Sequence, residues 1–353
     1  MAAALTSLTI ILIAVYLLIV ISNYFFIPSL DEISEKLRLS PSVAGATLMA
    51  AGSSAPELSI ALFALFTHGG AHSDMGIGTI VGSAVFNILV ITGLCAVIRS
   101  TAITISAIIR DTVFYLASIL AMLYVFWDGS ITGYEPLLLI ALYGLYLLAL
   151  YFLPGDEFTE RSEEAQLLAA SARSASGNIF RRVDSLFKWG VTLVAGNPVV
   201  NYLRSFAVSV LIIVGLSKLL VDHAIIFAEA IHLPPVIIAL TILACGTSAP
   251  DLISSIIVAR RGHGDMAISN AVGSNIFDIL IGLGLPWLIT LYLAGRKSIP
   301  VGTGNLLESV FILIATVLIF FVLLWTHRRL GKKEGIILLL LYAAYITWTV
   351  LTS

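Results

Sequence analysis

Long, uninterrupted stretches of apolar residues dominate the pattern of hydrophobic and polar positions along this chain. A helix needs about 20 mostly apolar residues to cross the roughly 30 Å hydrocarbon core of a bilayer. Ten stretches meet that requirement, and we predict a membrane-spanning helix in each of them: 4–27, 44–66, 75–98, 106–126, 132–153, 205–228, 233–258, 266–292, 304–326 and 335–351. The pattern therefore predicts an all-α, polytopic membrane protein.

A single long polar stretch, residues 154–204, separates the first five predicted helices from the last five. We therefore divide the chain into a first five-helix repeat (1–153), a connecting loop (154–204) and a second five-helix repeat (205–353). Residues near 185–200 of the loop are apolar enough to lie along the membrane interface, and an ordinary linker explains them equally well.

The positions of lysine and arginine predict the orientation, because these residues concentrate in short cytoplasmic connections. Sixteen of the nineteen fall in the odd-numbered connections, whereas the opposite side receives only Arg296 and Lys297, and Lys218 lies inside the sixth helix. We therefore expect a multi-pass protein of the plasma membrane, with loop 154–204 in the cytoplasm and both termini outside.

The composition excludes several classes of protein. The chain is 59% hydrophobic and 11% charged, whereas soluble domains carry roughly 25% charged residues. That balance excludes a soluble enzyme, a disordered chain, a basic nucleic-acid-binding protein and a disulfide-stapled secreted domain. Cys95 and Cys245 both lie in apolar runs, so we interpret them as small buried hydrophobic residues.

Two parts of the chain resemble each other. Gly45–Glu57 reads like Ala239–Asp251, and after a three-residue shift Asp74–Leu89 matches Asp265–Leu280 at nine of sixteen positions. Five predicted helices separate the copies, so the copies cross the membrane in opposite senses. Inverted repeats of this kind are typical of secondary transporters, whose substrate site lies near the midplane where the repeats meet.

Each copy carries Gly-Ser/Thr-Ser-Ala-Pro followed by an acid, Glu57 or Asp251, in the middle of a predicted span. Carboxylates inside a membrane are costly and mark functional sites. Because proline has no N–H and disturbs the helix before it, we expect carbonyls at about Ala50–Ser53 and Ala244–Thr247 to be freed as oxygen ligands.

The second part of each copy adds more oxygen atoms. Ser83 and Asn87 share one helix face at i and i+4, as do Ser274 and Asp278. Carboxylate, hydroxyl, amide and carbonyl oxygens suit a hard cation such as Ca²⁺ or Na⁺. Nitrogen and sulfur ligands do not fit the pattern, because the histidines lie at predicted helix ends: His68, His72, His223, His232, His263 and His327.

The two copies differ in charge at one matched position, where the first has Asn87 and the second Asp278. Glu57 and Asp251 balance one Ca²⁺, so a third ionised carboxylate leaves one negative charge. Either K⁺ or a proton at Asp278, with Asn275 as a neighbouring ligand, satisfies that charge.

These segments, about 45–94 and 239–287, resemble the alpha repeats of the cation/calcium exchanger superfamily, and most of all those of its potassium-dependent sodium/calcium exchangers. The similarity lies in Ala-Ala-Gly-Ser-Ser-Ala-Pro-Glu57, Ala-Cys-Gly-Thr-Ser-Ala-Pro-Asp251 and Gly-Ser-Asn-Ile-Phe-Asp278. The resemblance implies the sodium/calcium exchanger fold, with Glu57 and Asp251 as central Ca²⁺ ligands. It also implies further Ca²⁺ and Na⁺ ligands: the side chains of Ser53, Ser54, Ser83, Asn87, Thr247, Ser248 and Ser274, and the carbonyls of Ala50 and Ala244. In the potassium-dependent branch, an aspartate at the place of Asp278 is tied to potassium.

We therefore expect an electrogenic antiporter that exchanges Na⁺ for Ca²⁺, and not an enzyme. Whether the exchange depends on K⁺ is open at this point. Its expected partners are the transported inorganic cations and the lipid bilayer; no covalently bound cofactor, nucleic acid or protein partner is predicted. Two alternatives remain: a Ca²⁺/H⁺ exchanger of the same superfamily, and a cation channel or non-transporting scaffold.

Overall fold

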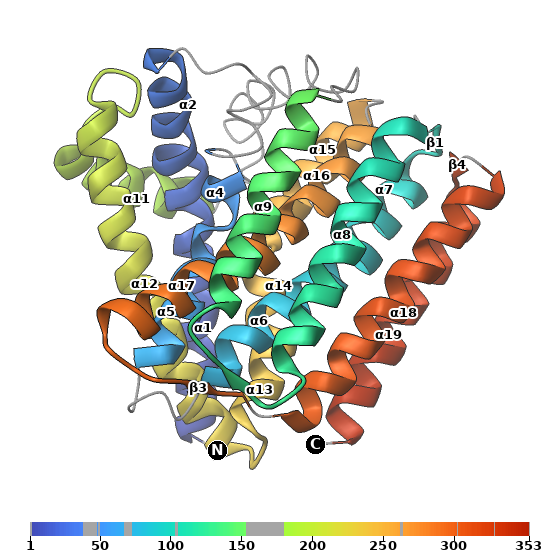
Figure 1. The fold of residues 1–353 in the computed structure, drawn as a ribbon. Coiled ribbons are helices and arrows are strands. Elements are labelled where there is room, and N and C mark those ends of the chain that lie inside the picture. Colours follow the sequence, from blue (N-terminus) through green and yellow to red (C-terminus); the bar gives the residue numbers. More distant parts are fainter. Residues whose placement is uncertain are drawn as a thin grey trace.

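The computed structural model describes residues 2–37, 48, 50–66, 73–102, 105–152, 180–261, 264–301, 303–327 and 329–352. Most of these residues form helices that run side by side in one bundle (Figure 1). The first half contains α1 (Ala2–Ile21), η1 (Ser22–Phe26), α2 (Ile27–Lys36), α4 (Ala50–Ser53), α5 (Ala55–Phe66), α6 (Ser73–Phe86), η4 (Asn87–Ile91), α7 (Thr92–Ile98), β1 (Thr101–Ala102), α8 (Ile105–Phe126), β2 (Ser130–Ile131) and α9 (Glu135–Phe152). Segments named η are π-helical turns.

The second half begins with a helix from the connecting loop, α11. It contains α11 (Phe180–Ala195), α12 (Tyr202–Ala230), α13 (Pro235–Ile238), η5 (Ala239–Leu243), α14 (Ala244–Thr247), α15 (Ala249–Arg261), α16 (Gly264–Phe277), η6 (Asp278–Leu283), α17 (Gly284–Leu288), η7 (Ile289–Leu293), β3 (Ile299–Pro300), α18 (Thr303–His327), β4 (Arg329–Leu330) and α19 (Lys332–Leu351).

The predicted spans agree with the helices. Within the described residues, seven helices are long and apolar enough to cross a membrane, and three shorter apolar helices, Ala55–Phe66, Glu135–Leu150 and Pro235–Thr247, bring the number to the expected ten. Residues 44–47 of the second predicted span lie outside the described residues. The fold is therefore that of an all-α, multi-pass membrane protein.

The prediction that the first helix ends at residue 27 is wrong. It continues through η1 and α2 to Lys36, and a salt bridge of 3.4 Å from Lys36 to Glu32 lies in its last turn. The apolar run ends where charged residues begin, but a helix that passes the membrane surface keeps one buried face, here Leu30 and Ser34. Pro28 lies inside this continuous helix directly after the π turn, a local change in the hydrogen-bond pattern of the kind that accompanies proline in helices.

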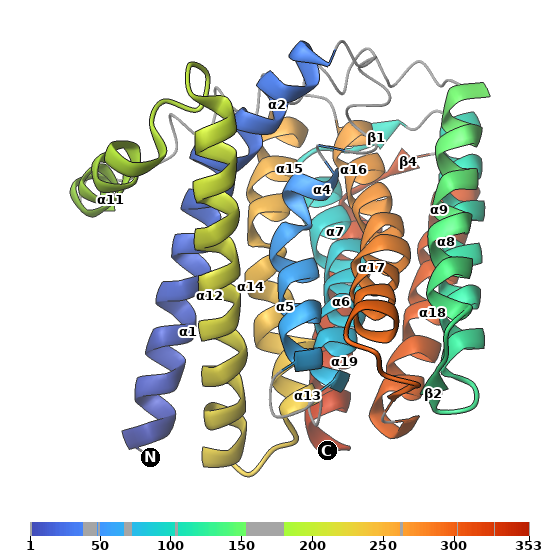
Figure 2. The ribbon, with the colours of Figure 1, turned by 60° about the vertical axis from the view of Figure 1, so that its left-hand side comes forward.

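The two halves cross the bundle in opposite directions. In Figure 2, α4 and α5 descend where α14 and α15 ascend. Two small sheets repeat this relationship: β1, after the third span, pairs with β4, before the tenth, and β3, after the eighth, pairs with β2, before the fifth. The β1–β4 sheet lies at the upper end of the bundle and the β2–β3 sheet at the lower end (Figure 1). Equivalent connections therefore pair at opposite faces, as an inverted repeat requires.

Matched π turns mark the same relationship inside the bundle. The turn η4 begins at Asn87 and η6 begins at Asp278, which is the matched position of the second copy. Single π turns within helices are frequent at functional sites, because they change the direction in which side chains point.

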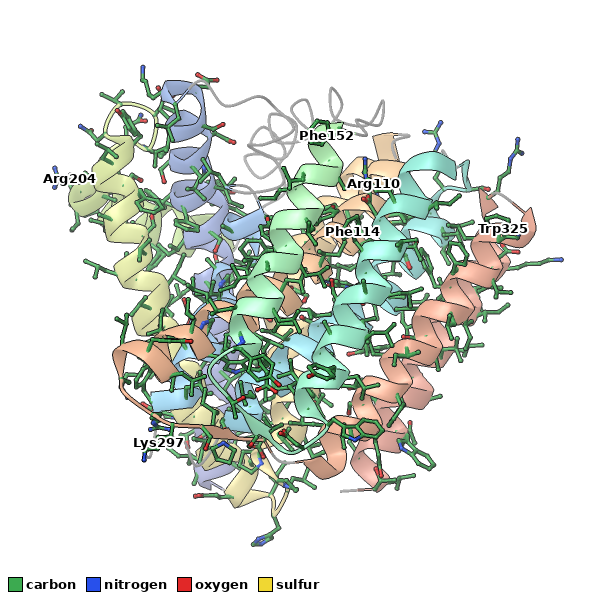
Figure 3. All side chains as sticks on the ribbon, in the orientation of Figure 1. Arg110, Phe114, Phe152, Arg204, Lys297 and Trp325 are labelled. Carbon is green, nitrogen blue, oxygen red and sulfur yellow. The ribbon has the colours of Figure 1, made fainter. Side chains whose placement is uncertain are left out.

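The polar centre is enclosed and the rim is apolar. Every residue of α6 except Asp74 is buried, whereas large apolar side chains such as Phe152 and Trp325 project outward from α9 and α18 (Figure 3). Outward-facing apolar side chains are what a bilayer solvates, so the exposed surface and the buried polar residues both fit a membrane-embedded bundle.

The loop helix α11 packs one face on this bundle. Val191 and Ala195 are buried, Trp189 and Leu193 are exposed, and the Lys188 ammonium lies 3.0 Å from the centre of the Tyr24 ring. The remaining loop residues, 153–179, lie outside the described part of the chain.

The basic residues follow the predicted segregation. Arg110 and Arg204 lie in the upper half of the bundle and Lys297 at its lower end (Figure 3). The end of α2 and both strands of the β1–β4 sheet, with Arg329 in β4, also lie at the upper end (Figure 1).

Cysteines introduced by Val200→Cys and Ser298→Cys should react with an impermeant thiol reagent from opposite faces of the membrane. Both positions are exposed, one just before α12 and the other just before β3. Because basic connections face the cytoplasm, we expect Ser298→Cys to label in intact cells and Val200→Cys only after permeabilisation. The unmodified chain, with buried Cys95 and partly buried Cys245, gives the background. Labelling of both positions from one face contradicts the inverted topology.

Candidate functional site

The centre of the bundle is built from crossed segments of the two repeats. The helices α4 and α5, which lead to and carry Glu57, contact α16 and η6 of the second repeat. In the same way α14 and α15, which lead to and carry Asp251, contact α6 and η4 of the first repeat. The segment that carries each acid therefore packs against the second part of the other copy.

Glycine makes this crossing possible. A Cβ atom at Gly82 would collide with the Leu240 carbonyl oxygen and would lie 2.8 Å from the Ala244 Cβ. A Cβ at Gly246 would lie 2.7 Å from a methyl group of Val15 on α1. Because these backbones touch their neighbours, the acidic turns are held at a fixed depth.

Both acidic spans break at the predicted place. Ser54 stands between α4 and α5, and Ser248 stands between α14 and α15. Each new helix then carries proline at its second residue, in the first turn. Glu57 and Asp251 lie in the first turns of α5 and α15, where the helix dipole favours a negative charge.

The prediction that the carbonyls of Ala50 and Ala244 are freed is wrong for this structure. Each accepts two hydrogen bonds from the turn that follows: Ala50 from the Ser54 amide (3.0 Å) and Ser53 Oγ (3.3 Å), Ala244 from the Ser248 amide (3.1 Å) and Thr247 Oγ1 (3.3 Å). The reason is that a proline removes the bond to the carbonyl four residues earlier, which here belongs to Gly52 or Gly246.

Three carboxylates gather in this region, from both repeats. Glu57, Asp251 and Asp278 are all at least nine-tenths buried, and Glu57 interacts electrostatically with both aspartates. Hydroxyls of the opposite repeat lie close to two of them: Thr247 lies near Glu57, and Ser54 lies near Asp278.

Ser274 extends this hydroxyl network. Its Oγ donates to Asp251 Oδ2 at 3.2 Å and lies 3.5 Å from Ser54 Oγ, which comes from the other repeat. The network therefore runs from one acidic turn to the other through side chains that can donate to a carboxylate or accept from a neighbour.

Four buried side-chain oxygens in this region have no hydrogen-bond partner: Glu57 Oε2, Asn87 Oδ1, Ser248 Oγ and Asp278 Oδ1. Two come from each repeat. Salt bridges in the described part of the chain do not involve Glu57 or Asp278. A buried acceptor without a donor is costly, and a bound cation removes that cost for several oxygens at once.

Acidic side chains alone do not make the site. Among the described residues, no three histidine, cysteine, aspartate or glutamate side chains converge closely enough to hold a metal ion. Neutral hydroxyl and amide oxygens must therefore complete any coordination shell, which is the pattern of flexible Ca²⁺ and Na⁺ sites rather than of zinc sites.

Two predicted ligands face their own helices. Ser53 Oγ donates to the Ala50 carbonyl and Ser83 Oγ donates to the Ile80 carbonyl at 2.9 Å. Their oxygen lone pairs stay available, because a hydroxyl that donates one bond still accepts others.

Sequence reasoning missed Tyr115. This fully buried residue of α8 lies 2.9 Å from the Asn275 amide nitrogen. It stands outside the two matched segments, about 45–94 and 239–287, so only the folded structure brings it to the site.

A second buried cluster lies apart from these oxygens. Arg110 Nε bonds Asp111 Oδ1 at 2.9 Å, and Ser269 Oγ donates to Asp111 Oδ2 at 3.3 Å. The bond between Ser269 and Asp111 joins α16 to α8.

Ten apolar helices, related as inverted halves around a buried polar centre, define a multi-pass membrane transporter. The sodium/calcium exchanger protein family matches residues 7–152 and 202–351. The chain belongs to this family, which confirms the resemblance found in the sequence.

Two human relatives align with nearly the whole chain. It is 33% identical to sodium/potassium/calcium exchanger 5 of Homo sapiens, over 96% of this chain and 82% of the relative. It is 27% identical to sodium/potassium/calcium exchanger 4 of Homo sapiens, over 95% and 79%.

Solved structures show the same fold. The sodium-calcium exchanger NCX_Mj, soaked with 10 mM Na⁺ and zero Ca²⁺, matches with a TM-score of 0.59 and 23% identity, over 98% of this chain and 99% of that chain. The H⁺/Ca²⁺ exchanger CAX matches with a TM-score of 0.70 and 15% identity, over 98% and 86%.

The close crossing at Gly82 predicts a specific packing defect. Gly82→Ala should lower the melting temperature of the purified protein, because overpacking of this kind costs about 1–3 kcal/mol. Gly144→Ala is the matched control: a Cβ at Gly144 meets nothing within 4 Å, and alanine favours a helix more than glycine does. Equal melting temperatures for Gly82→Ala and the unmodified protein contradict the close approach.

Proposed function

We propose that this chain is an electrogenic antiporter that exchanges Na⁺ for Ca²⁺ across the plasma membrane and moves Ca²⁺ out of the cytoplasm. The observation that carries the proposal is the set of four buried, unpartnered oxygens, Glu57 Oε2, Asn87 Oδ1, Ser248 Oγ and Asp278 Oδ1. They come from both repeats, next to Asp251, and their chemistry is that of a hard-cation site. The printed names of the relatives, sodium/potassium/calcium exchangers, support the same cargo.

Charge explains obligatory exchange. An empty site holds up to three negative charges in a medium of low dielectric constant, which opposes any rearrangement that seals it from water. One Ca²⁺ or several Na⁺ remove that charge, so either kind of occupant permits the change between inward-facing and outward-facing states. Net charge crosses the membrane when the occupants differ in total charge.

Within this proposal the residues have separate roles. Glu57 and Asp251 are the principal Ca²⁺ ligands, and the hydroxyls of Ser54, Thr247, Ser248 and Ser274 complete the Ca²⁺ and Na⁺ sites together with Asn87. Ser53 and Ser83 join them through the lone pairs that their helix bonds leave unused. The carbonyls of Ala50 and Ala244 contribute only if they exchange one of their present hydrogen bonds for a cation.

The larger organisation is part of the same proposal. The repeats comprise residues 1–153 and 205–353, loop 154–204 faces the cytoplasm and both termini lie outside. The partners are the transported cations and the surrounding lipid, and the chemistry needs no resident cofactor.

Counter-ion-dependent ⁴⁵Ca²⁺ uptake into proteoliposomes tests the function. Vesicles loaded with Na⁺ should accumulate Ca²⁺ when diluted into Na⁺-free medium, and the rate should change with membrane voltage. Uptake driven by a proton gradient and indifferent to Na⁺ identifies a Ca²⁺/H⁺ exchanger instead. A steady Ca²⁺ current without any counter-ion dependence identifies a channel.

Glu57→Gln and Asp251→Asn should each abolish Ca²⁺ uptake in that assay, because each removes a charged ligand from a divalent site. Both substitutions keep the shape of the side chain, so membrane insertion and the yield of folded protein should stay normal. Asp222→Asn is the matched control: it removes an exposed carboxylate whose partner is Lys218. Near-normal exchange by Glu57→Gln or Asp251→Asn refutes the assignment of the site.

Asp278 predicts a dependence on K⁺. If its carboxylate is ionised, a monovalent cation must balance it after Ca²⁺ has neutralised Glu57 and Asp251, and K⁺ should then stimulate Na⁺-driven Ca²⁺ flux. Asp278→Asn should make that flux independent of K⁺ without destroying it. A titration of K⁺ at a fixed Na⁺ gradient and clamped voltage measures this, and a flat response with a nearly silent Asp278→Asn substitution indicates a proton at Asp278.

A further inference from the structure

Two asparagines from opposite repeats form a buried, directional amide pair. Asn87 Nδ2 donates to Asn275 Oδ1 at 2.9 Å. Asn275 Nδ2 in turn donates to the Ala84 carbonyl at 3.2 Å and to the Tyr115 hydroxyl at 2.9 Å. Asn87, Asn275 and Tyr115 are each at most 1% exposed, so water does not compete for these bonds.

Chemistry fixes the direction of the pair. An amide has a donating and an accepting end of nearly equal size, but the Ala84 carbonyl can only accept. The nitrogen of Asn275 must therefore face Ala84, which turns its oxygen toward Asn87. Asn87 must then present its own nitrogen to Asn275, and its oxygen is the end left over.

That remaining oxygen is the unpartnered Asn87 Oδ1 of the proposed cation site. Its surroundings are those of the site: Asn275 lies between Ser274 and Asp278 in the chain, and α15, which carries Asp251, packs against η4, which begins at Asn87.

The comparison of the two repeats shows why only Asn87 has an amide partner that fixes its direction. The residue matched to Asn275 in the first repeat is Ala84. Alanine has no side-chain amide, so Asp278 has no equivalent amide partner, and its Oδ1 is without a hydrogen bond. A carboxylate presents an oxygen in either orientation, so its direction need not be fixed. The direction of an amide must be fixed, because its NH₂ end repels a cation.

We propose that Asn275 is a positioning residue, anchored by the Ala84 carbonyl and Tyr115, that turns the Asn87 amide so that its oxygen faces the bound cation. This assignment rests on the proposed cation site, and it replaces the expectation that Asn275 is itself a ligand for K⁺ or a proton. Both ends of the Asn275 amide are already engaged with protein partners.

Cation binding to the purified full-length protein in detergent tests the pair without transport. The rise of the melting temperature with added Ca²⁺, and separately with Na⁺, gives an apparent Kd for each ion. Asn87→Ala should weaken Ca²⁺ binding about ten- to 150-fold, as expected for the loss of one buried bond to a charge. Asn275→Ala should weaken it by a similar factor, and the double variant should be no weaker than Asn87→Ala alone.

The double variant separates positioning from the other roles. If Asn275→Ala weakens binding further in the Asn87→Ala background, Asn275 is a ligand in its own right. If it lowers the melting temperature without changing either Kd, its role is structural only. Either result overturns the proposal, as does a wild-type protein that neither Ca²⁺ nor Na⁺ stabilises.

Tyr115→Phe gives a second, milder test if Asn275→Ala yields too little folded protein. It removes one of the two acceptors of the Asn275 amide and keeps the ring, so Ca²⁺ binding should weaken by less than in Asn275→Ala. An unchanged Kd counts against the anchor. Because these titrations need no ion gradient, a lack of Na⁺-driven ⁴⁵Ca²⁺ uptake would refute the exchange function and leave the result on the amide pair intact.

Discussion

The constraint on which the rest of the structure depends is the cost of unbalanced negative charge inside a membrane. Glu57, Asp251 and Asp278 are buried together between the two repeats. Isolated carboxylates at that depth either take up a proton or take up a cation. The surrounding hydroxyls reduce the cost without removing the charge, because Ser274 donates a hydrogen bond to Asp251 but carries no positive charge. A site of this kind is stable when loaded and strained when empty.

To bring the acids together, the helix backbones of the two repeats must touch each other directly. Gly82 provides this on α6, where even one methyl group would collide with the Leu240 carbonyl. The serines at the two helix breaks, Ser54 and Ser248, complete the geometry, since each ends one short helix and lets the next begin with proline at its second residue. The Gly-Ser/Thr-Ser-Ala-Pro segments therefore determine both how the helices pack and where the acids lie, so a substitution that changes one also changes the other.

The sequence predicts most of the frame and the charged part of the site, because apolar length, basic residues and internal likeness are local signals. It does not predict the continuation of the first helix to Lys36, since the apolar run ends before the helix does. It places the free carbonyls only to within one helical turn: within the predicted ranges, Ala50 and Ala244 keep their hydrogen bonds, and the prolines remove the bonds to Gly52 and Gly246. The direction of the Asn87–Asn275 pair depends on the contacts of the Asn275 amide with the Ala84 carbonyl of α6 and with Tyr115 of α8. No pattern in one sequence contains these contacts between helices.

Two of the departures from symmetry introduce an amide or a charge on one side only: Asn87 is matched with Asp278, and Ala84 with Asn275. Inverted halves built from the same segments give inward-facing and outward-facing arrangements of similar energy. The reason is that the two halves exchange their conformations when the protein changes from one state to the other. Asymmetry in the ligands does not disturb this balance, because the four residues lie where the halves meet. In the proposed site, one pair sets the charge and the other sets the direction of a neutral ligand, so selectivity would change at these positions while the alternation of the two states is kept.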